Sequence, residues 1–264
     1  MNIVVCIKQV PDTSDIKWTK NNTIDRSKVD CILNPCDEFA IEWALKIKEK
    51  VGNSKVTALT MGPGNALKIL RQAIALGCDD AILLTDKHFA GSDTFATSRI
   101  LSKCIEEKIP NYDLIICGQY AIDGDTAQTG PGIAQFLDIP QITYVDKIID
   151  IKDDRIIVKK VTEDQELELE MMIPGLICIL KSEEKDLRIP KVQDNIYAQN
   201  FEIKEYNLRD INLDASKVGL KGSLTYVKNA FKYERKVNTI KYEDETDDQI
   251  AKIIVEEILK LESI

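Results

Sequence analysis

The sequence lacks most of the residues on which metal binding and cysteine–histidine chemistry depend. It contains one histidine, His88, and none of its seven cysteines forms a C-x-x-C pair. Because zinc sites and Cys/His catalytic pairs need several such residues, we expect no metal site and no catalytic pair of this kind. The cysteines lie mostly within apolar segments, so we expect them to be reduced residues of the core.

Excess positive charge and long apolar segments are also lacking. The formal net charge is −9 and no basic stripe compensates for it, which argues against a nucleic-acid-binding surface. No window approaches about eighteen consecutive apolar residues, and the first residues lack the basic region and the cleavage site of a signal peptide. We therefore expect a cytoplasmic protein without a membrane span.

What the sequence does contain, over roughly its first half, is an alternation of strand and helix patterns. The apolar runs are NIVVCIKQV, KVTALTMG, DAILLTD and YDLIICG. The helical patterns that follow them are 38–51, with Asp37 as its N-cap, then 65–76, a helix that ends at Lys108, and 126–138. The alternation predicts an α/β fold with a doubly wound, Rossmann-like parallel sheet.

After Pro140 the pattern changes. The segments TYVDKIIDIKDDRIIVKKV and QELELEMMI alternate apolar and polar residues, which predicts an antiparallel addition at one edge of the sheet, and GLICIL is one more apolar strand. Residues 183–245 are poor in apolar clusters, and an amphipathic helix follows them. We expect a nucleotide-binding domain over 1–182 and an arm with a helix over 183–264. The arm would pack on a partner subunit, and a disordered tail is the alternative.

Four loops follow the predicted strands at the carboxyl edge of the sheet, where ligands bind in folds of this kind. They are KQVPD, MGPG, AGSDT and GQYAIDGDTAQTG. Their glycines allow close backbone approach, and the helices that follow offer free N–H groups to a phosphate. The G-x-G-x-x-G and G-K-[ST] fingerprints and the G-x-S-x-G nucleophile turn are absent from the sequence. The loops therefore predict a nucleotide-sized site without a visible catalytic residue.

The turn over 118–131 carries two carboxylates, Asp123 and Asp125, and no Lys or Arg. Two like charges about 6 Å apart at an effective dielectric constant near 20 repel by roughly 3 kcal/mol. This repulsion would cancel the contribution of one phosphate–amide hydrogen bond, which is about 1.5–3 kcal/mol. At least one carboxylate should therefore point away from a diphosphate. Helix capping, hydrogen bonding to a ribose and simple turn formation stay open as roles, whereas Mg²⁺ would need more oxygen ligands.

Five segments resemble the β subunit of the electron transfer flavoproteins: VVCIKQVPDT, NPCDEFAIEWALKIKE, TMGP, AIALGCDDAILLTD and GQYAIDGDTAQTGP. The resemblance implies an αβ heterodimer that carries electrons between flavin enzymes, with one FAD held mainly by the α subunit. It also implies a second nucleotide in the β subunit, which is AMP in ordinary members and FAD in members that bifurcate or confurcate electrons with NADH. The arm over 183–264 would then wrap the α subunit and reach a partner dehydrogenase.

The resemblance also implies which residues contact the nucleotide, and it assigns no catalytic residue. The cofactor-binding residues would be Cys6, Asn34, Pro35, Cys36, Asp37, Met61, Gly62, Thr94, Gly118, Gln119, Tyr120, Ala121, Ile122, Asp123, Gly124, Asp125, Thr126, Ala127, Gln128 and Thr129. Thr94 would lie near the isoalloxazine ring. In the loop RIPKVQDNIYA, Val192 and Ile196 would form the apolar contact with the dehydrogenase, although QNFEI replaces the lysine-rich run that often follows.

The turn favours the FAD-binding branch of the family. The small Ala127 stands where AMP-binding members have the Asn of a DDDCNQTG-like turn, and FAGSDT resembles the loop beside the flavin in the FAD-binding branch. Thr129, where that branch commonly has Val, is a departure. We therefore expect FAD, with electrons passing between NAD(H), ferredoxin and a flavin dehydrogenase of the acyl-CoA or 2-hydroxy-acid (lactate) type. An ordinary carrier with structural AMP and a free-standing adenine-nucleotide sensor are the alternatives.

Overall fold

The computed structural model describes residues 1–12, 30–152, 154–181, 187–228 and 246–262. The chain divides into two compact units, Met1–Asn229 and Ala230–Ile264. In the second unit the described part is one helix, α7 (Asp247–Glu262). All other elements belong to the first unit, which contains the loops singled out in the sequence.

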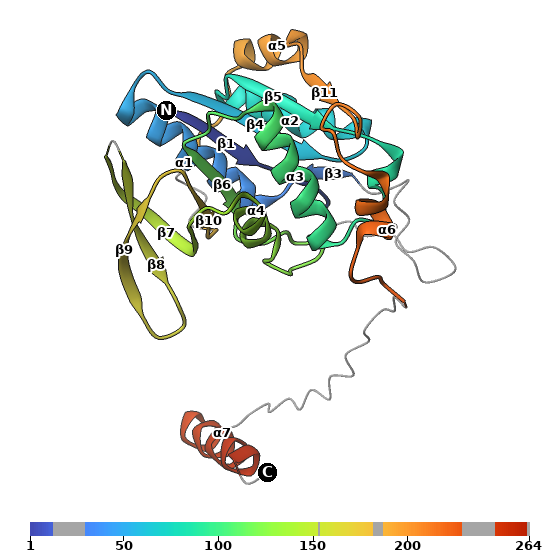
Figure 1. Cartoon of the computed structure of the whole chain (residues 1–264). Helices are drawn as coiled ribbons and strands as arrows, with labels where there is room; N and C mark the ends of the chain where they lie inside the picture. Colours follow the sequence, from blue (N-terminus) through green and yellow to red (C-terminus); the bar gives the residue numbers. More distant parts are fainter. Residues whose placement is uncertain (13–29, 153, 182–186, 229–245, 263–264) are drawn as a thin grey trace. The chain divides into compact units, whose positions relative to one another are not determined.

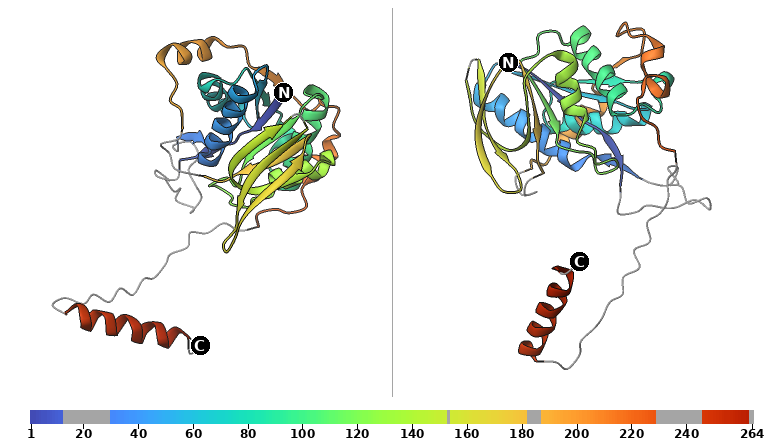
Figure 2. Two further views of the ribbon diagram at one scale, coloured as in Figure 1. Left: turned by 90° about the vertical axis from the view of Figure 1, so that its left-hand side faces the viewer. Right: turned by 60° about the horizontal axis from the view of Figure 1, so that its bottom comes forward.

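The first unit is built on a sheet that has nine strands within the described residues, in the order β11-β5-β4-β1-β6-β10-β7-β8-β9 (Figure 1). The parallel strands are β1 (Asn2–Cys6), β4 (Lys55–Met61), β5 (Asp80–Leu84), β6 (Leu114–Gly118), β10 (Gly175–Ile179) and the short edge strand β11 (Lys204–Tyr206). β7 (Gln141–Lys152) pairs parallel with β10 and antiparallel with β8 (Arg155–Val161), which pairs antiparallel with β9 (Glu166–Met172). Figure 2 shows the long ribbon of β8 and β9 at this edge. The predicted doubly wound sheet with an antiparallel addition is confirmed.

The strand order reverses between β1 and β6. β4 and β5 extend the sheet on one side of β1, whereas β6 and then β10 extend it on the other side. In doubly wound sheets the connections diverge at such a point and leave a crevice outside the carboxyl ends of the two strands. The loops that follow β1 and β6 therefore flank the place where a fold of this kind binds its ligand.

Helices cover both faces of the sheet. α1 (Pro35–Val51) and α2 (Leu67–Leu76) pack on one face through apolar residues such as Phe39 and Leu70. α3 (Thr94–Lys108) and α4 (Thr129–Leu137) pack on the other face through Ile100 and Ile133, and they lie in front of the sheet in Figure 1. Two fully buried apolar clusters, one on each face, hold the layers together.

Three helices begin at other residues than the sequence predicts. α2 begins at Leu67 rather than at 65, after the 3-10 turn Gly64–Ala66. α1 begins at Pro35 rather than at 38, with Asn34 instead of Asp37 in the N-cap position, because proline fits the first helical position. α4 begins at Thr129 rather than at 126. Asp125 and Ala127 have φ values of +46° and +53°, in the left-handed region that a right-handed helix cannot contain.

Residues 187–228 pack against the sheet and helices of the same unit. α5 (Val192–Asn200) lies beside α2, where Arg71 Nη1 donates to the carbonyl oxygens of Ala198 at 2.7 Å and Gln199 at 2.6 Å. β11 extends the sheet beyond β5, and α6 (Gly219–Gly222) follows. The remaining short elements are β2 (Gln9–Pro11), β3 (Cys31–Leu33) and the 3-10 turns Gly64–Ala66, Lys87–Phe89 and Ala215–Lys217. The domain boundary at 182 and the wrapping of a partner subunit stay predictions.

Over the described ranges, no helix has the length and apolar composition needed to cross a bilayer. The same residues contain no group of three His, Cys, Asp or Glu side chains placed to hold a metal ion. All seven cysteines are free thiols and six of them are buried, as predicted for reduced core residues. His88 lies half exposed in the 3-10 turn after β5.

Candidate functional site

A cavity of about 450 Å³ lies at the carboxyl ends of β1 and β6, where the strand order reverses. We call it the carboxyl-edge cavity. It is lined by Cys6, Ile7, Lys8, Asn34, Asp37, Met61, Ser92, Asp93, Thr94, Thr97, Leu101, residues 117–121, residues 124–130 and Thr225. Loops from four strand ends thus meet around one space, as the sequence predicts.

Most of the predicted cofactor-binding residues line this cavity. The exceptions are Pro35, Cys36, Gly62, Ile122 and Asp123. The lining residues that the sequence did not single out are Ile7, Lys8, Ser92, Asp93, Thr97, Leu101, Cys117, Gly130 and Thr225. A signal existed for four of them, because Lys8 lies in KQVPD, Ser92 and Asp93 lie in AGSDT, and Gly130 lies in GQYAIDGDTAQTG. No sequence signal pointed to Thr225, because it lies far in the sequence from the other lining residues.

A buried carboxylate, that of Asp37, joins the ends of β1 and β6. Its Oδ2 accepts the backbone N–H of Lys8 at 2.7 Å, and the backbone N–H of Gly118 also donates to it. Burial outweighs these hydrogen bonds and raises the pKa of Asp37 to about 7. A Cβ at position 118 would collide with the Asp37 carboxylate and with Cys36, so only glycine fits there.

The amide of Asn34 fixes the first part of the turn after β6. Its Nδ2 donates to the carbonyl oxygen of Tyr120 at 2.9 Å, and its Oδ1 accepts the N–H of Ile122 at 3.2 Å. Asn34 is fully buried and also hydrogen-bonds Asp37. Asn34 and Asp37 therefore form a rigid internal frame behind the turn.

The two carboxylates of the turn have different surroundings. The Lys8 ammonium lies 2.7 Å from Asp123 Oδ1 and 2.8 Å from Oδ2, so Asp123 is held by a cation from the end of β1 and does not line the cavity. Asp125 does line it and keeps the left-handed φ of +46°. The charge that the turn lacks is thus supplied by another loop.

The second part of the turn presents backbone N–H groups. Left-handed Ala127 precedes right-handed Gln128, and such alternation makes a concave arrangement of amides that binds anions. Among the described residues the N–H groups of Thr126, Ala127 and Gln128 have no protein acceptor. The first N–H groups of α4 also lack an acceptor within the helix. The turn is therefore built to receive a negative group.

Asp93 brings a distant segment to the cavity. One of its oxygens caps α3 by accepting the N–H of Ala96 at 2.9 Å. The other accepts the N–H groups of Leu224 at 2.8 Å and Thr225 at 2.9 Å, and the Thr225 hydroxyl at 3.0 Å. These hydrogen bonds lower the pKa of Asp93 against its partial desolvation, so the carboxylate stays ionised. Nearby, Thr94 Oγ1 donates to Gln128 Oε1 at 2.9 Å and ties α3 to the turn.

The floor of the cavity contains neutral thiols. Cys6 and Cys117 line it as neighbours on β1 and β6, and Cys178 on β10 is the next neighbour of Cys117. Hydrogen bonding to Cys117 and burial raise the pKa of the Cys6 thiol well above its ordinary value, and hydrogen bonding to Cys178 and burial do the same for Cys117. Thiols held neutral are poor nucleophiles, so the floor is an apolar surface rather than a reactive one.

The fold and this cavity define the class of protein: a doubly wound α/β protein with a ligand-sized cavity at the switch point of its sheet. A comparison with family models matches residues 21–184 to the electron transfer flavoprotein domain. Among curated proteins, the electron transfer flavoprotein subunit beta of Thermoanaerobacterium thermosaccharolyticum is 47% identical over 229 residues, which cover 86% of each chain.

Two further relatives carry other names. Protein FixA of Sinorhizobium fredii is 46% identical over 239 residues, 88% of this chain and 83% of the relative. The acryloyl-CoA reductase electron transfer subunit gamma of Anaerotignum propionicum is 43% identical over 239 residues, 88% of each chain. The chain therefore belongs to the electron transfer flavoprotein β-subunit and FixA family, as its motifs predicted, and its function is electron transfer.

Proposed function

We propose that the carboxyl-edge cavity binds an adenine nucleotide by its phosphates and that this nucleotide is FAD. The observation that carries the proposal is the concave turn at 126–128, whose residues line the cavity together with Lys8 and whose N–H groups have no protein acceptor among the described residues. Backbone amides, a helix N-terminus and an ammonium are the donors that a diphosphate requires. With Asp123 paired to Lys8, the turn opposes an anion with one carboxylate instead of two.

The rest of the lining suits the remainder of such a ligand. Cys6 and Cys117 give an apolar floor, and Asp125 and Thr126 offer polar groups that could serve ribose hydroxyls. The volume of about 450 Å³ falls within the roughly 300–1,000 Å³ of small-molecule sites. The donor set therefore fits a nucleotide without a metal ion.

A bound flavin would supply the redox chemistry, accepting or giving one or two electrons. The side chains of this chain would bind and orient it and exclude water, which agrees with a lining that offers no nucleophile–base pair. We propose that electrons pass between NAD(H), ferredoxin and a partner flavin dehydrogenase by bifurcation or confurcation, in a cytoplasmic complex with an α subunit. The relative named as an acryloyl-CoA reductase subunit favours a dehydrogenase of the acyl-CoA type over the 2-hydroxy-acid type.

The exposed apolar face of α5 would be the surface for that dehydrogenase. Val192 is 76% exposed and Ile196 is 59% exposed, beside the exposed Ile189 and Tyr197. Large apolar side chains gathered in this way on the surface mark contacts with other proteins.

A second candidate is an ordinary electron carrier that holds AMP in the same cavity. The cavity volume favours it, because 450 Å³ is in the lower half of the usual range and FAD is much larger than AMP. Ala127 favours FAD, since its side chain is smaller than the Asn of the turn in AMP-binding members of the family.

The test is the nucleotide content of the complex purified with its α subunit. Two FAD per heterodimer are expected. One FAD with one AMP would establish the second candidate instead. One FAD and no nucleotide in this chain would overturn both, and a stable free monomer that binds adenine nucleotides but never an α subunit would favour the free-standing sensor.

A further inference from the structure

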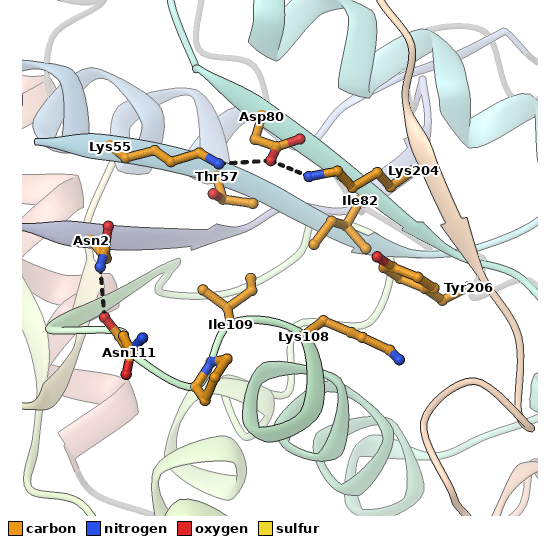
Figure 3. Close-up of a pocket in the computed structure, with 11 residues that line it drawn as sticks. Asn2, Lys55, Thr57, Asp80, Ile82, Lys108, Ile109, Asn111, Lys204 and Tyr206 are labelled. Carbon is orange, nitrogen blue, oxygen red and sulfur yellow. Dashed lines mark hydrogen bonds and ion pairs between the residues drawn. The ribbon is translucent and has the colours of Figure 1, made fainter.

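A second cavity lies at the opposite edge of the sheet, where β1, β4 and β5 begin (Figure 3). We call it the amino-edge cavity. Its volume is about 210 Å³, and it is lined by Asn2, Lys55, Thr57, Asp80, Ile82, residues 108–111, Lys204 and Tyr206. Because parallel strands run in one direction, it is separated from the carboxyl-edge cavity by the length of the strands.

The lining is positively charged although the whole chain is negative. It contains the ammonium groups of Lys55, Lys108 and Lys204 and one carboxylate, Asp80, which gives +2 in a chain with a net charge of −9. A concave site whose charge is opposite in sign to that of the molecule attracts small anions.

Asp80 holds two of these lysines together. Its Oδ2 accepts from Lys55 Nζ at 2.8 Å and from Lys204 Nζ at 2.6 Å, and Figure 3 shows the two side chains reaching it from opposite sides. Burial opposes ionisation of Asp80, but the two ammonium groups lower its pKa, so it remains a carboxylate. One negative charge therefore neutralises only one of two positive charges that are held close together.

The two ammonium groups keep donors for a ligand. Each has three N–H donors, and Asp80 takes one from each. Both lysine side chains are 51% exposed, so the remaining donors are accessible. A second anion beside them would relieve their mutual repulsion.

Part of the remaining lining is apolar. Ile82 and Ile109 face the space between the lysines and the end of α3 in Figure 3, Pro110 and Tyr206 add further apolar surface, and the other lining residues are the polar Asn2, Thr57 and Asn111. An engineered cavity of about 150 Å³ in another protein accepts benzene, so 210 Å³ holds a ligand of slightly more than six heavy atoms. The ligand thus combines one charged group with a short apolar body.

We propose that the amino-edge cavity is a binding site for a small monocarboxylate. The carboxylate contacts Lys55 and Lys204, whose group with Asp80 has one uncompensated positive charge, and the apolar body lies against Ile109 and Pro110. This inference does not depend on the nucleotide in the carboxyl-edge cavity.

The test uses the full chain, pentanoate as the probe and pentan-1-ol as its uncharged analogue. Pentanoate is expected to shift the backbone NMR signals of residues 55–57, 80–82, 108–111 and 204–206 in a saturable way, and pentan-1-ol to bind more weakly. Lys55→Gln leaves Asp80 paired with Lys204, so the edge strand stays anchored while the group loses its net charge. We expect it to weaken pentanoate binding roughly threefold to fivefold.

The matched control is Lys103→Gln, which removes the same charge from α3 where it pairs with Glu106 and Glu107 on the helix surface. It should leave pentanoate affinity unchanged. The proposal is overturned if these signals do not shift, if Lys55→Gln and Lys103→Gln have equal effects, or if inorganic phosphate binds with the Lys55 dependence and pentanoate does not.

Discussion

Lys8 and Asp123 form a bidentate ion pair although 115 residues separate them in the sequence. The pair connects the end of β1 to the turn after β6, across the point where the strand order reverses. Lys8 also lines the carboxyl-edge cavity, so under the proposed function its ammonium is the charged donor and Asp123 competes for it. A phosphate that binds the turn must share or take this ammonium.

The first prediction concerns the two partners of this pair. Lys8→Met should weaken AMP binding about tenfold or more, since a charge-assisted hydrogen bond contributes roughly 1.5–3 kcal/mol. Adenosine, which has no phosphate, should bind the variant and the original chain equally. Isothermal titration calorimetry with AMP and with adenosine gives the ratio of the affinities of the original chain and of Lys8→Met for each ligand.

Asp123→Asn should have the opposite effect, because it frees Lys8 and removes a negative charge near the phosphate. We expect AMP affinity to rise roughly threefold to fivefold at low salt. Asp164→Asn, in the exposed turn between β8 and β9, is the control for net charge and should change nothing. Weaker binding to Asp123→Asn would instead assign Asp123 a direct contact with the ligand.

The second prediction is a pH dependence of stability caused by Asp37. The unfolded chain ionises this group near 3.8 and the folded chain near 7, so between these values the folded chain holds one more proton. The stability contributed by protonated Asp37 is full below about pH 4 and is lost as the pH rises to about 7. The slope is roughly 1.4 kcal/mol per pH unit.

Urea unfolding at pH 5 and pH 7 checks this for the original chain and for Asp37→Asn. The original chain should lose about 2–3 kcal/mol more than the variant over this interval, in addition to changes that both share. If the original chain and Asp37→Asn lose the same free energy of unfolding between pH 5 and pH 7, then Asp37 is already ionised in the folded chain at pH 5.

The third prediction concerns Asp93. Asp93→Ala removes the N-cap of α3 and the acceptor for Leu224 and Thr225, so the free energy of unfolding should fall by about 1–2 kcal/mol. Hydrogen exchange at the amides of 224 and 225 should accelerate at the same time. Asp214→Ala removes only the cap of a 3-10 turn and should leave those two amides protected. Slow exchange in Asp93→Ala would show that other contacts hold this segment.

The fourth prediction tests the surface proposed for the dehydrogenase. Val192→Ser with Ile196→Ser should raise the KM for the partner dehydrogenase about tenfold, since loss of buried apolar contacts at an interface costs more than 1 kcal/mol. The nucleotide content should not change. Ile149→Ser, at a β7 side chain that is 45% exposed, removes an exposed apolar side chain elsewhere and is the control. Equal KM values for the two variants would rule out α5 as the contact.

The sequence predicted the architecture well because its signals are local. Apolar runs such as that of β1 and the helical periodicity after it determine a parallel sheet with covered faces. The predicted start of α4 was wrong because Asp125 and Ala127 adopt left-handed φ values. Sequence patterns associate such values with glycine.

The composition of the cavity was predicted in part for a related reason. Loops at the carboxyl edge follow from strand direction, so residues such as Met61 and Thr94 could be placed there. Which side chains meet across loops depends on tertiary geometry. The Lys8–Asp123 pair and the anchoring of Thr225 by Asp93 join segments 115 and 132 residues apart, and no local pattern encodes them.

Asn34, Asp37 and Gly118 direct their hydrogen bonds at other parts of the protein, so they would remain in place whatever nucleotide is bound. If the carboxyl-edge cavity binds a nucleotide as proposed, discrimination between nucleotides is left to the turn that follows, and chiefly to residues 125–128. This makes the turn an exchangeable module: its sequence could be replaced to change cofactor preference, in the laboratory or in evolution, without redesign of the scaffold that carries it.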